Sequence, residues 1–180
     1  KTGLHITLQR LPVEAGQQLI DMYLAFEPRN CFQGLPPLKD AACVQWVEGM
    51  LQTGIHVVAI SAEPTLVGHA ALFPIRDGKC ELLVVVCPNF QNLGIGTKLV
   101  ESCIDLADEL HFTKIWLPVD ATNVRARHIY RKCGFDYASN GRHRELDMVC
   151  NVRRCRPAIC NAIDAMEASV PPPHFPFVGK

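Results

Sequence analysis

A short glycine-containing segment, Gln91-Asn92-Leu93-Gly94-Ile95-Gly96, follows the apolar run from Leu82 to Val86 and precedes a helical pattern. A turn of this kind leaves the first N–H groups of the helix without intrahelical acceptors, so that they can bind phosphate oxygens. Gly94 and Gly96 would let an anion approach the backbone closely. The segment therefore indicates an anion site, although two glycines alone leave open a plain turn between strand and helix.

The spacing excludes the two common nucleotide-binding loops. A P-loop requires Gly-x-x-x-x-Gly-Lys-Ser/Thr, whereas this chain has Gly-x-Gly-Thr-Lys from Gly94 to Lys98. The dinucleotide fingerprint requires a third glycine near Thr97 to Leu99, and the sequence has none there. Another class of anion-binding turn must be considered.

Two motifs together point to one family. The residues from Gln91 to Gly96 match Gln/Arg-x-x-Gly-x-Gly/Ala, and Val86-Cys87-Pro88 stands in the Val-x-Pro place before them. Downstream, Asn123 to Phe135 matches Asn-x-x-Ala-x-x-x-Tyr-x-x-x-Gly-Phe without a gap. In this order, and separated by one long helix and one strand, the motifs resemble those of the GNAT superfamily of N-acyltransferases over residues 81 to 137.

The resemblance implies a single GNAT-type domain of the α/β (α+β) class, with a strongly twisted mixed sheet whose central strands splay apart and are flanked by helices. Acetyl-CoA, the co-substrate, would lie in the V between the fourth and fifth strands. Asn92 stands where many relatives have glycine, and asparagine tolerates the positive φ of such a turn. By position, the pantetheine arm would contact the backbone of Leu83, Val84, Val85 and Val86 and also Asn123, and the diphosphate would contact the N–H groups of Gln91, Asn92, Leu93, Gly94, Ile95, Gly96 and Thr97.

Acyl transfer to a primary amine poses two proton problems. The amine, with a pKa near ~10, must lose a proton before attack, and the departing thiolate must be protonated or stabilised. A positioned base and a positioned acid each contribute about 10²–10⁴-fold. Such groups are therefore sought beside the motifs.

Tyr130 is the candidate acid, because it lies two helical turns after Asn123 and both can face one cleft. By the resemblance, its hydroxyl would reach the thioester sulfur; the alternative is a tyrosine packed between helix and sheet. Glu81, at the start of the apolar strand, is the candidate base, since partial burial would raise the pKa of its carboxyl group. A carboxylate facing solvent, with a water chain as the base, is the alternative.

Charge and cysteine content limit the other functions. Eighteen basic residues balance eighteen acidic ones, which argues against a nucleic-acid or anionic-membrane protein. No apolar run reaches the ~18 residues of a membrane-spanning helix. Nine cysteines are an odd number, and their scatter predicts reduced, mostly buried thiols in a cytoplasmic protein. Neither Cys87 nor Cys133 has a neighbouring histidine, so a covalent cysteine relay is disfavoured, and the cysteine spacing predicts no metal site.

Periodicity and turn residues predict the elements that must position these groups. Helices are expected from Pro12 to Leu24, from an Asp40 cap to Gly54, from Gly94 to Leu110 and from Asn123 to Lys132. Strands are expected at residues 4–10, 55–61, 66–75, 81–86, 115–119, 135–137 and 144–151. This order indicates one domain over residues 1–151 with a C-terminal extension over residues 152–180. The extension has a short helical pattern and a proline-rich apolar end, which suggests docking on the domain or on a second copy in a homodimer.

The sequence thus predicts an acetyl-CoA-dependent N-acetyltransferase that works by direct attack of a primary amine in a ternary complex. The loop from Phe26 to Pro37 and the turn from Ala138 to His143 are expected to form the acceptor site. In the first loop, Arg29 would engage an acidic group and Glu27 a cationic amine, so the sign of the acceptor charge stays open. A small-molecule amine is favoured. A protein lysine or N-terminal acetyltransferase and a non-catalytic acyl-CoA-binding regulatory module are the alternatives.

Overall fold

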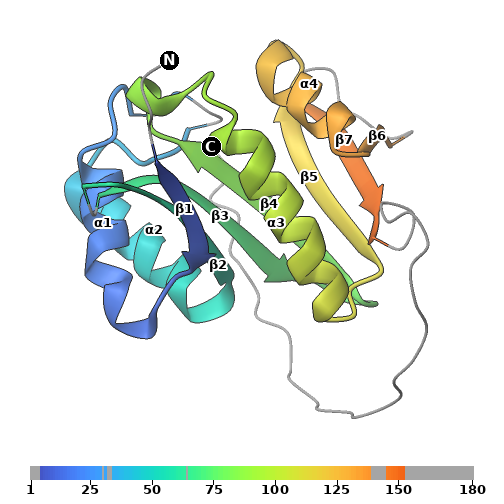
Figure 1. The fold of residues 1–180 in the computed structure, drawn as a ribbon, viewed down its shortest axis with the longest axis horizontal. Coiled ribbons are helices and arrows are strands. Elements are labelled where there is room, and N and C mark those ends of the chain that lie inside the picture. The colour runs from blue at the N-terminus through green and yellow to red at the C-terminus, as the bar shows by residue number, and fades with distance from the viewer. Residues whose placement is uncertain (1–4, 30, 32–33, 64, 139–144, 153–180) are drawn as a thin grey trace.

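The computed structural model describes residues 5–29, 31, 34–63, 65–138 and 145–152. They form a seven-stranded mixed sheet with the strand order β1-β2-β3-β4-β5-β7-β6 (Figure 1). Only β4 and β5 are parallel, and every other neighbouring pair is antiparallel. The strands are β1 (Ile6–Arg10), β2 (Ile55–Ser61), β3 (Leu66–Pro74), β4 (Lys79–Val86), β5 (Lys114–Asp120), β6 (Asp136–Tyr137) and β7 (Glu145–Asn151).

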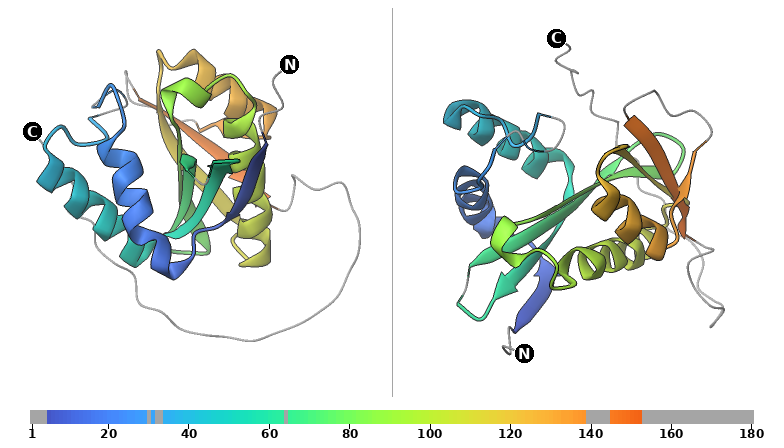
Figure 2. Two further views of the ribbon diagram at one scale, coloured as in Figure 1. Left: turned by 60° about the vertical axis from the view of Figure 1, so that its left-hand side comes forward. Right: turned by 90° about the horizontal axis from the view of Figure 1, so that it is seen from above.

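Helices cover the two faces of this sheet unequally (Figure 2). On one face, α3 packs on β2, β3 and β4, and α4 lies beside α3. On the other face, α1 and α2 pack against each other and cover β2 to β4. None of these helices is long and apolar enough to cross a membrane. The α-helices are α1 (Gly16–Leu24), α2 (Asp40–Thr53), α3 (Ile95–Glu109) and α4 (Val124–Lys132), and the 3₁₀ turns are η1 (Val13–Ala15) and η2 (Pro88–Phe90).

The predicted order of helices and strands is confirmed within the described residues, with differences at element ends. The first helix begins at Gly16 after η1, rather than at Pro12. Asp40 does not cap α2: Lys39 is the N-cap residue, and Asp40 is the first helical residue, where a carboxylate favours the helix dipole. The predicted C-terminal helix lies outside the described residues, and the division at residue 151 stays a prediction.

The cysteines are distributed as expected. Within the described residues, seven cysteines are free thiols, and Cys43, Cys80, Cys103 and Cys150 among them are buried. Cys80 and Cys103 belong to the apolar cluster between the sheet and α3. Burial raises the pKa of each of these two thiols to about 12, so both behave as apolar core residues rather than as nucleophiles.

A buried chain of hydrogen bonds joins α1 to the sheet. The Met50 carbonyl can only accept, so His56 Nε2–H donates to it at 3.0 Å. His56 Nδ1 therefore accepts from His69 Nε2 at 2.9 Å, and His69 Nδ1 accepts from the Tyr23 hydroxyl at 2.7 Å. In this series of hydrogen bonds, every donor faces an acceptor only while both imidazoles are neutral.

The hydrogen bonds of Tyr23, His69 and His56 predict a loss of stability in acid. Burial lowers the pKa of His56, and burial together with the neighbouring His56 lowers the pKa of His69 well below its usual value. The unfolded chain binds protons at these histidines below pH ~6.5, whereas the folded chain binds them only at lower pH. Their contribution is therefore complete above pH ~6.5 and is lost as the pH falls, by up to about 2 kcal/mol per histidine between pH 7 and 5.

Denaturant unfolding at pH 5, 6 and 7 tests this expectation. The free energy of unfolding should fall less between pH 7 and 5 in His69→Gln than in the wild type. His128→Gln, which changes an exposed histidine, should keep the wild-type dependence. An identical pH dependence in all three proteins would show that these hydrogen bonds do not keep His56 and His69 neutral.

Candidate active site

A gap opens between β4 and β5 halfway along the sheet. The two strands pair only at Lys79 with Lys114, Cys80 with Ile115 and Glu81 with Trp116. Beyond these pairs β4 continues to Val86 and β5 to Asp120 without pairing to each other. The splayed central strands expected from the resemblance are therefore present, and the vertex of the V lies at the last pair, Glu81 and Trp116.

The register of β4 decides which backbone groups face the gap. The Cys87 N–H donates to the Val67 carbonyl at 2.9 Å, so the backbone of Cys87 points toward β3. Since backbone groups alternate in direction along a strand, those of Val86 and Val84 point toward the gap. The N–H and C=O groups of Leu83 and Val85 point toward β3, opposite Ala71 and His69. The four residues that the sequence analysis grouped together thus divide into two that face the gap and two that pair within the sheet.

The turn after β4 ends in the left-handed conformation that begins α3. Gly94 is the N-cap residue, with φ +82°, and a Cβ added there would meet no atom within 4 Å. Asn92 has φ +63°, as its tolerance of positive φ predicted. The first helical bond runs from the Lys98 N–H to the Gly94 carbonyl, so the N–H groups of Ile95, Gly96 and Thr97 precede the intrahelical ladder. Three backbone donors therefore lie together at the open end of the gap.

Gly96 lies where three elements meet. A Cβ added at this position would lie 3.4 Å from Ile129 Cδ1 on α4 and 3.7 Å from Val86 Cγ2 at the end of β4. Glycine thus lets the start of α3 approach both neighbours closely. This packing fixes the turn before α3 against the two elements that border the gap.

Gln91 links the turn to both sides of the gap. Its Nε2 donates to the Val86 carbonyl at 3.1 Å, and its Oε1 accepts from Arg125 Nη1 on α4. Asn123 is the N-cap residue of α4, and its side-chain oxygen accepts from the Ala126 N–H at 3.1 Å. The bond between Gln91 and Arg125 was not visible from sequence spacing, because these two residues are far apart in the chain.

Tyr130 lies on α4 with its ring in the core. The ring packs against Phe135, with centroids 5.7 Å apart, and the residue is 9% exposed. Its hydroxyl has no hydrogen-bond partner within the described residues. Every fully buried side-chain oxygen in these residues does have a partner, so the Tyr130 oxygen is not fully buried. The hydroxyl must therefore reach an accessible surface. Burial raises the pKa of Tyr130 to about 12, so the hydroxyl keeps its proton at neutral pH.

Glu81 lies at the vertex, on the face that carries α1 and α2. Side chains alternate along β4, and Cys80 and Leu82 belong to the cluster under α3, so Glu81 and Leu83 point to the opposite face. Burial raises the pKa of the Glu81 carboxyl above its ordinary value. By the same alternation, Trp116, which sequence reasoning missed, lies on the same face beside Glu81.

The gap could have been predicted from the sequence at Pro118. A proline has no N–H for a ladder, so it is normally confined to strands with an open side. Pro118 pairs with Asp147 on one side and borders the gap on the other. A proline inside a strand expected to lie at the centre of the sheet indicates that one of its edges is unpaired.

The first acceptor loop is only partly as predicted. Arg29 was expected to engage an acidic ligand, but its Nη1 lies 2.6 Å from Asp40 Oδ1 and 3.2 Å from the Leu38 carbonyl, so it binds within the chain. Phe26 is buried in the apolar cluster that α1 and α2 form against the sheet. Of the second predicted segment, the turn from Ala138 to His143, residues 139–143 lie outside the described residues.

A hollow of about 580 Å³ lies away from the vertex, between the end of α1 and the segment from Cys87 to Phe90. It opens beside the end of β4, about five strand residues from Glu81, which at ~3.3 Å per residue is roughly 17 Å. It is therefore not the place where a group at the vertex would react. Burial raises the pKa of the Cys87 thiol, which disfavours a covalent relay through it.

Comparison with known proteins identifies the family. The sequence model of the Acetyltransferase (GNAT) family matches residues 18–135. The chain therefore belongs to the GNAT acetyltransferase family, as the two motifs predicted.

Relatives and solved structures agree with this assignment. Spermidine N(1)-acetyltransferase of Escherichia coli is 30% identical over 81 residues, which cover 40% of this chain and 44% of that protein. The [ribosomal protein bS18]-alanine N-acetyltransferase of Salmonella typhimurium is 29% identical over 80 residues, which cover 44% of this chain and 54% of that protein. The chain thus spans about half the length of the curated relatives it matches. The crystal structure of Vibrio cholerae spermidine N-acetyltransferase in complex with CoA and spermine shares the fold. It aligns over 83% of this chain and 97% of the Vibrio cholerae chain, with a TM-score of 0.66 and 20% sequence identity.

The turn before α3 makes a prediction about cofactor binding. Gly94→Ala puts a methyl group into the open space above the helix N-terminus and disfavours the backbone at φ +82°. Calorimetric titration should show CoA binding weakened by about tenfold or more, which is about 1.4 kcal/mol.

Gly78→Ala is the matched control, because Gly78 also has positive φ, +64°, and a Cβ there would make only ordinary contacts, with Thr113. Both variants should lose similar stability, whereas only Gly94→Ala should lose CoA affinity. Equal CoA affinities in the two variants would remove the turn from the cofactor site.

Proposed function

We propose that this protein transfers the acetyl group of acetyl-CoA directly to a primary amine held at the vertex of the V. The observation that carries the proposal is the side of β4 that β5 leaves unpaired, next to a turn with three backbone donors. An extended pantetheine arm can pair with such a side as an additional strand, and a diphosphate suits the helix N-terminus. Acetyl-CoA carries both groups in one molecule.

The donor would run from the turn toward the vertex. In this arrangement Ile95, Gly96 and Thr97 bind the diphosphate through their N–H groups, and Val84 and Val86 bind the pantetheine amides. From Val86 to Glu81 the strand rises roughly 17 Å, at ~3.3 Å per residue, which is of the order of an extended pantetheine arm. The thioester would therefore arrive beside Glu81.

Tyr130 would act on the leaving sulfur. Because the pKa of its hydroxyl is about 12, above that of a thiol, complete proton transfer to the thiolate is uphill. A protonated hydroxyl can instead donate a hydrogen bond to the sulfur as its negative charge develops. Such charge-assisted bonds contribute about 1.5–3 kcal/mol, which is enough for a tenfold effect on rate.

Glu81 would act on the amine. An amine that arrives as an ammonium ion must lose a proton before it can attack. A carboxylate whose pKa is raised toward the working pH accepts this proton better than an exposed carboxylate does. The position of Glu81 at the last pair before the gap supports this role, because a donor running along β4 ends there. Direct attack requires no acetylated side chain.

A cationic small-molecule acceptor is the favoured class. Glu81 on β4 and Asp147 on β7 lie on one face of the sheet by strand alternation, with Trp116 between them and half-buried. None of the described helices covers β5 and β7 on this face (Figure 2). Carboxylates and an aromatic face attract an amine that carries a second positive charge. Two relatives, a spermidine N(1)-acetyltransferase and a [ribosomal protein bS18]-alanine N-acetyltransferase, support a small polyamine first and a protein acceptor second.

Thiol release from acetyl-CoA across a panel of amines tests the proposal. Spermidine, spermine, aromatic amines, lysine peptides and peptides with N-terminal alanine should be compared at equal concentration. A polyamine should give the highest kcat/KM. Faster turnover with a peptide would move the acceptor to a protein, and CoA binding without turnover on any amine would leave a non-catalytic module.

The role of the phenol predicts a selective defect. Tyr130→Phe removes only the hydroxyl, so turnover should fall about tenfold or more while CoA affinity stays nearly constant. Tyr137→Phe, at a more exposed tyrosine, is the matched control and should keep wild-type turnover. Equal turnover in the Tyr130 variant and the wild type would return this tyrosine to a packing role.

The role of the carboxylate predicts a change in pH profile. The base works deprotonated, so wild-type kcat/KM should rise with pH through a limb set by the raised pKa of Glu81. In Glu81→Gln this limb should flatten, and the two rates should converge at high pH, where free amine becomes abundant. Glu101→Gln, at an exposed glutamate of α3, should keep the wild-type profile. An unchanged profile in Glu81→Gln would favour a water chain as the base.

A further inference from the structure

Arg125 carries a positive charge that no carboxylate among the described residues neutralises. Its Nη1 donates to Gln91 Oε1, a neutral amide, and the arginine is exposed. The ion pairs within the described residues join Arg10 to Glu109, Arg29 to Asp40 and Arg131 to Asp136, and none involves Arg125. An arginine has five N–H donors, so most of this guanidinium is available for another acceptor.

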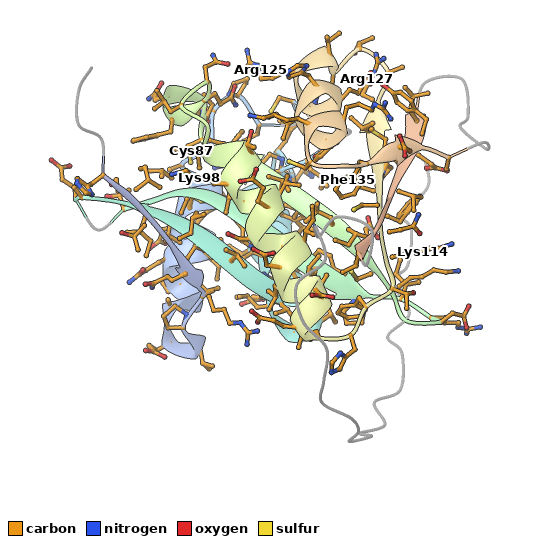
Figure 3. The ribbon with its side chains drawn as sticks, turned by 45° about the vertical axis from the view of Figure 1, so that its right-hand side comes forward. Cys87, Lys98, Lys114, Arg125, Arg127 and Phe135 are labelled. Carbon is orange, nitrogen blue, oxygen red and sulfur yellow. The ribbon has the colours of Figure 1, made fainter. Side chains whose placement is uncertain are left out.

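The other arginines of the same helix are used differently. Arg127 donates from Nε to the Tyr137 hydroxyl at 2.9 Å and from Nη1 to the Ala121 carbonyl at 2.7 Å. Arg131 binds Asp136. Figure 3 shows Arg125 and Arg127 leaving α4 on different sides, with Arg125 on the side of the turn before α3. Only Arg125 is directed to the open end of the gap.

The surroundings of Arg125 favour an anion. The residues from Pro88 to Lys98 and from Val124 to Lys132 include no aspartate or glutamate. Lys98, in the first turn of α3, adds a second positive charge near the three backbone N–H groups (Figure 3). Helix N-termini also carry partial positive charge. The side of the open end that the turn and α4 form is therefore electropositive, while Asp120 at the end of β5 accepts from the N–H and hydroxyl of Thr122.

Gln91 holds Arg125 in this position. Its Nε2 is occupied by the Val86 carbonyl at 3.1 Å, which fixes the orientation of the amide. Its Oε1 is then the atom turned to α4, where it can accept only from a donor such as Arg125. The two bonds make a continuous connection from the end of β4 through the turn to the guanidinium.

We propose that Arg125 binds the diphosphate of the acyl donor and that Gln91 is its positioning residue. The pair would select donors that carry a nucleotide diphosphate over donors that present only a pantetheine arm. This inference rests on the proposed function, because it assumes that the donor lies in the gap. An arginine suits the role, since its planar donors can contact two phosphate oxygens at once.

Binding and turnover measured with donors of different length test the proposal. In Arg125→Ala, calorimetric Kd values for CoA and for dephospho-CoA should both rise about tenfold, whereas kcat/KM for S-acetylpantetheine should stay unchanged. Arg125→Lys, which keeps the charge, should recover part of the CoA affinity. Lys132→Ala, at an exposed lysine of the same helix, is the matched control and should bind CoA as the wild type does.

The position of Gln91 has its own test. Because it acts through Arg125, Gln91→Ala should weaken CoA binding in the wild type and have little further effect in Arg125→Ala. Independent, additive effects in this double-mutant cycle would overturn its positioning role.

Three outcomes would overturn the role of Arg125. Equal losses with acetyl-CoA and S-acetylpantetheine would show a purely structural arginine. An effect on CoA that vanishes with dephospho-CoA would place Arg125 at the 3′-phosphate instead of the diphosphate, and an unchanged CoA affinity would remove it from the site. Because the CoA titrations need no turnover, they test Arg125 even if no amine proves to be a substrate.

Discussion

The structure depends on one constraint: the backbone of β4 has polar groups on a side that β5 does not reach beyond Glu81. Backbone N–H and C=O groups taken out of water must be paired. Within the described residues, the Val86 carbonyl accepts a hydrogen bond from the side chain of Gln91. Pro118 has no N–H with which β5 could extend the ladder. The open side of β4 thus offers backbone N–H and C=O groups with which an extended ligand could pair.

Under the proposed function, the gap would also separate the two substrates by face. The donor turn, α3 and α4 form its open end, where Gly96 lets them meet closely, and Glu81 and Trp116 form its vertex. An acceptor would approach from the face carrying α1 and α2, where no described helix covers β5 and β7. The chain from Tyr23 through His69 to His56 fixes α1 on that face without using a charged group. Donor and acceptor can then meet at the vertex without competing for the same surface.

The sequence predicted what depends on local patterns and missed what depends on long-range pairing. Helices, strands and the positive φ of Asn92 follow from residues a few positions apart. The direction of the Val84 and Val86 backbones depends on the register with β3, and the contact of Gln91 with Arg125 spans 34 positions. Arg29 was assigned to a ligand because its partner, Asp40, was assigned to a helix cap. Pro118 was the local sign of the gap, and its meaning required knowing which strands lie beside it.

Residue-resolved amide hydrogen exchange, with and without CoA, tests most directly whether the open side of β4 holds the donor. Bound CoA should slow exchange of the Val84 and Val86 N–H groups, which face the gap. Exchange of the Leu83 and Val85 groups, already paired with β3, should change little. Binding of CoA that leaves Val84 and Val86 exchanging as in the free protein would contradict a donor paired along β4.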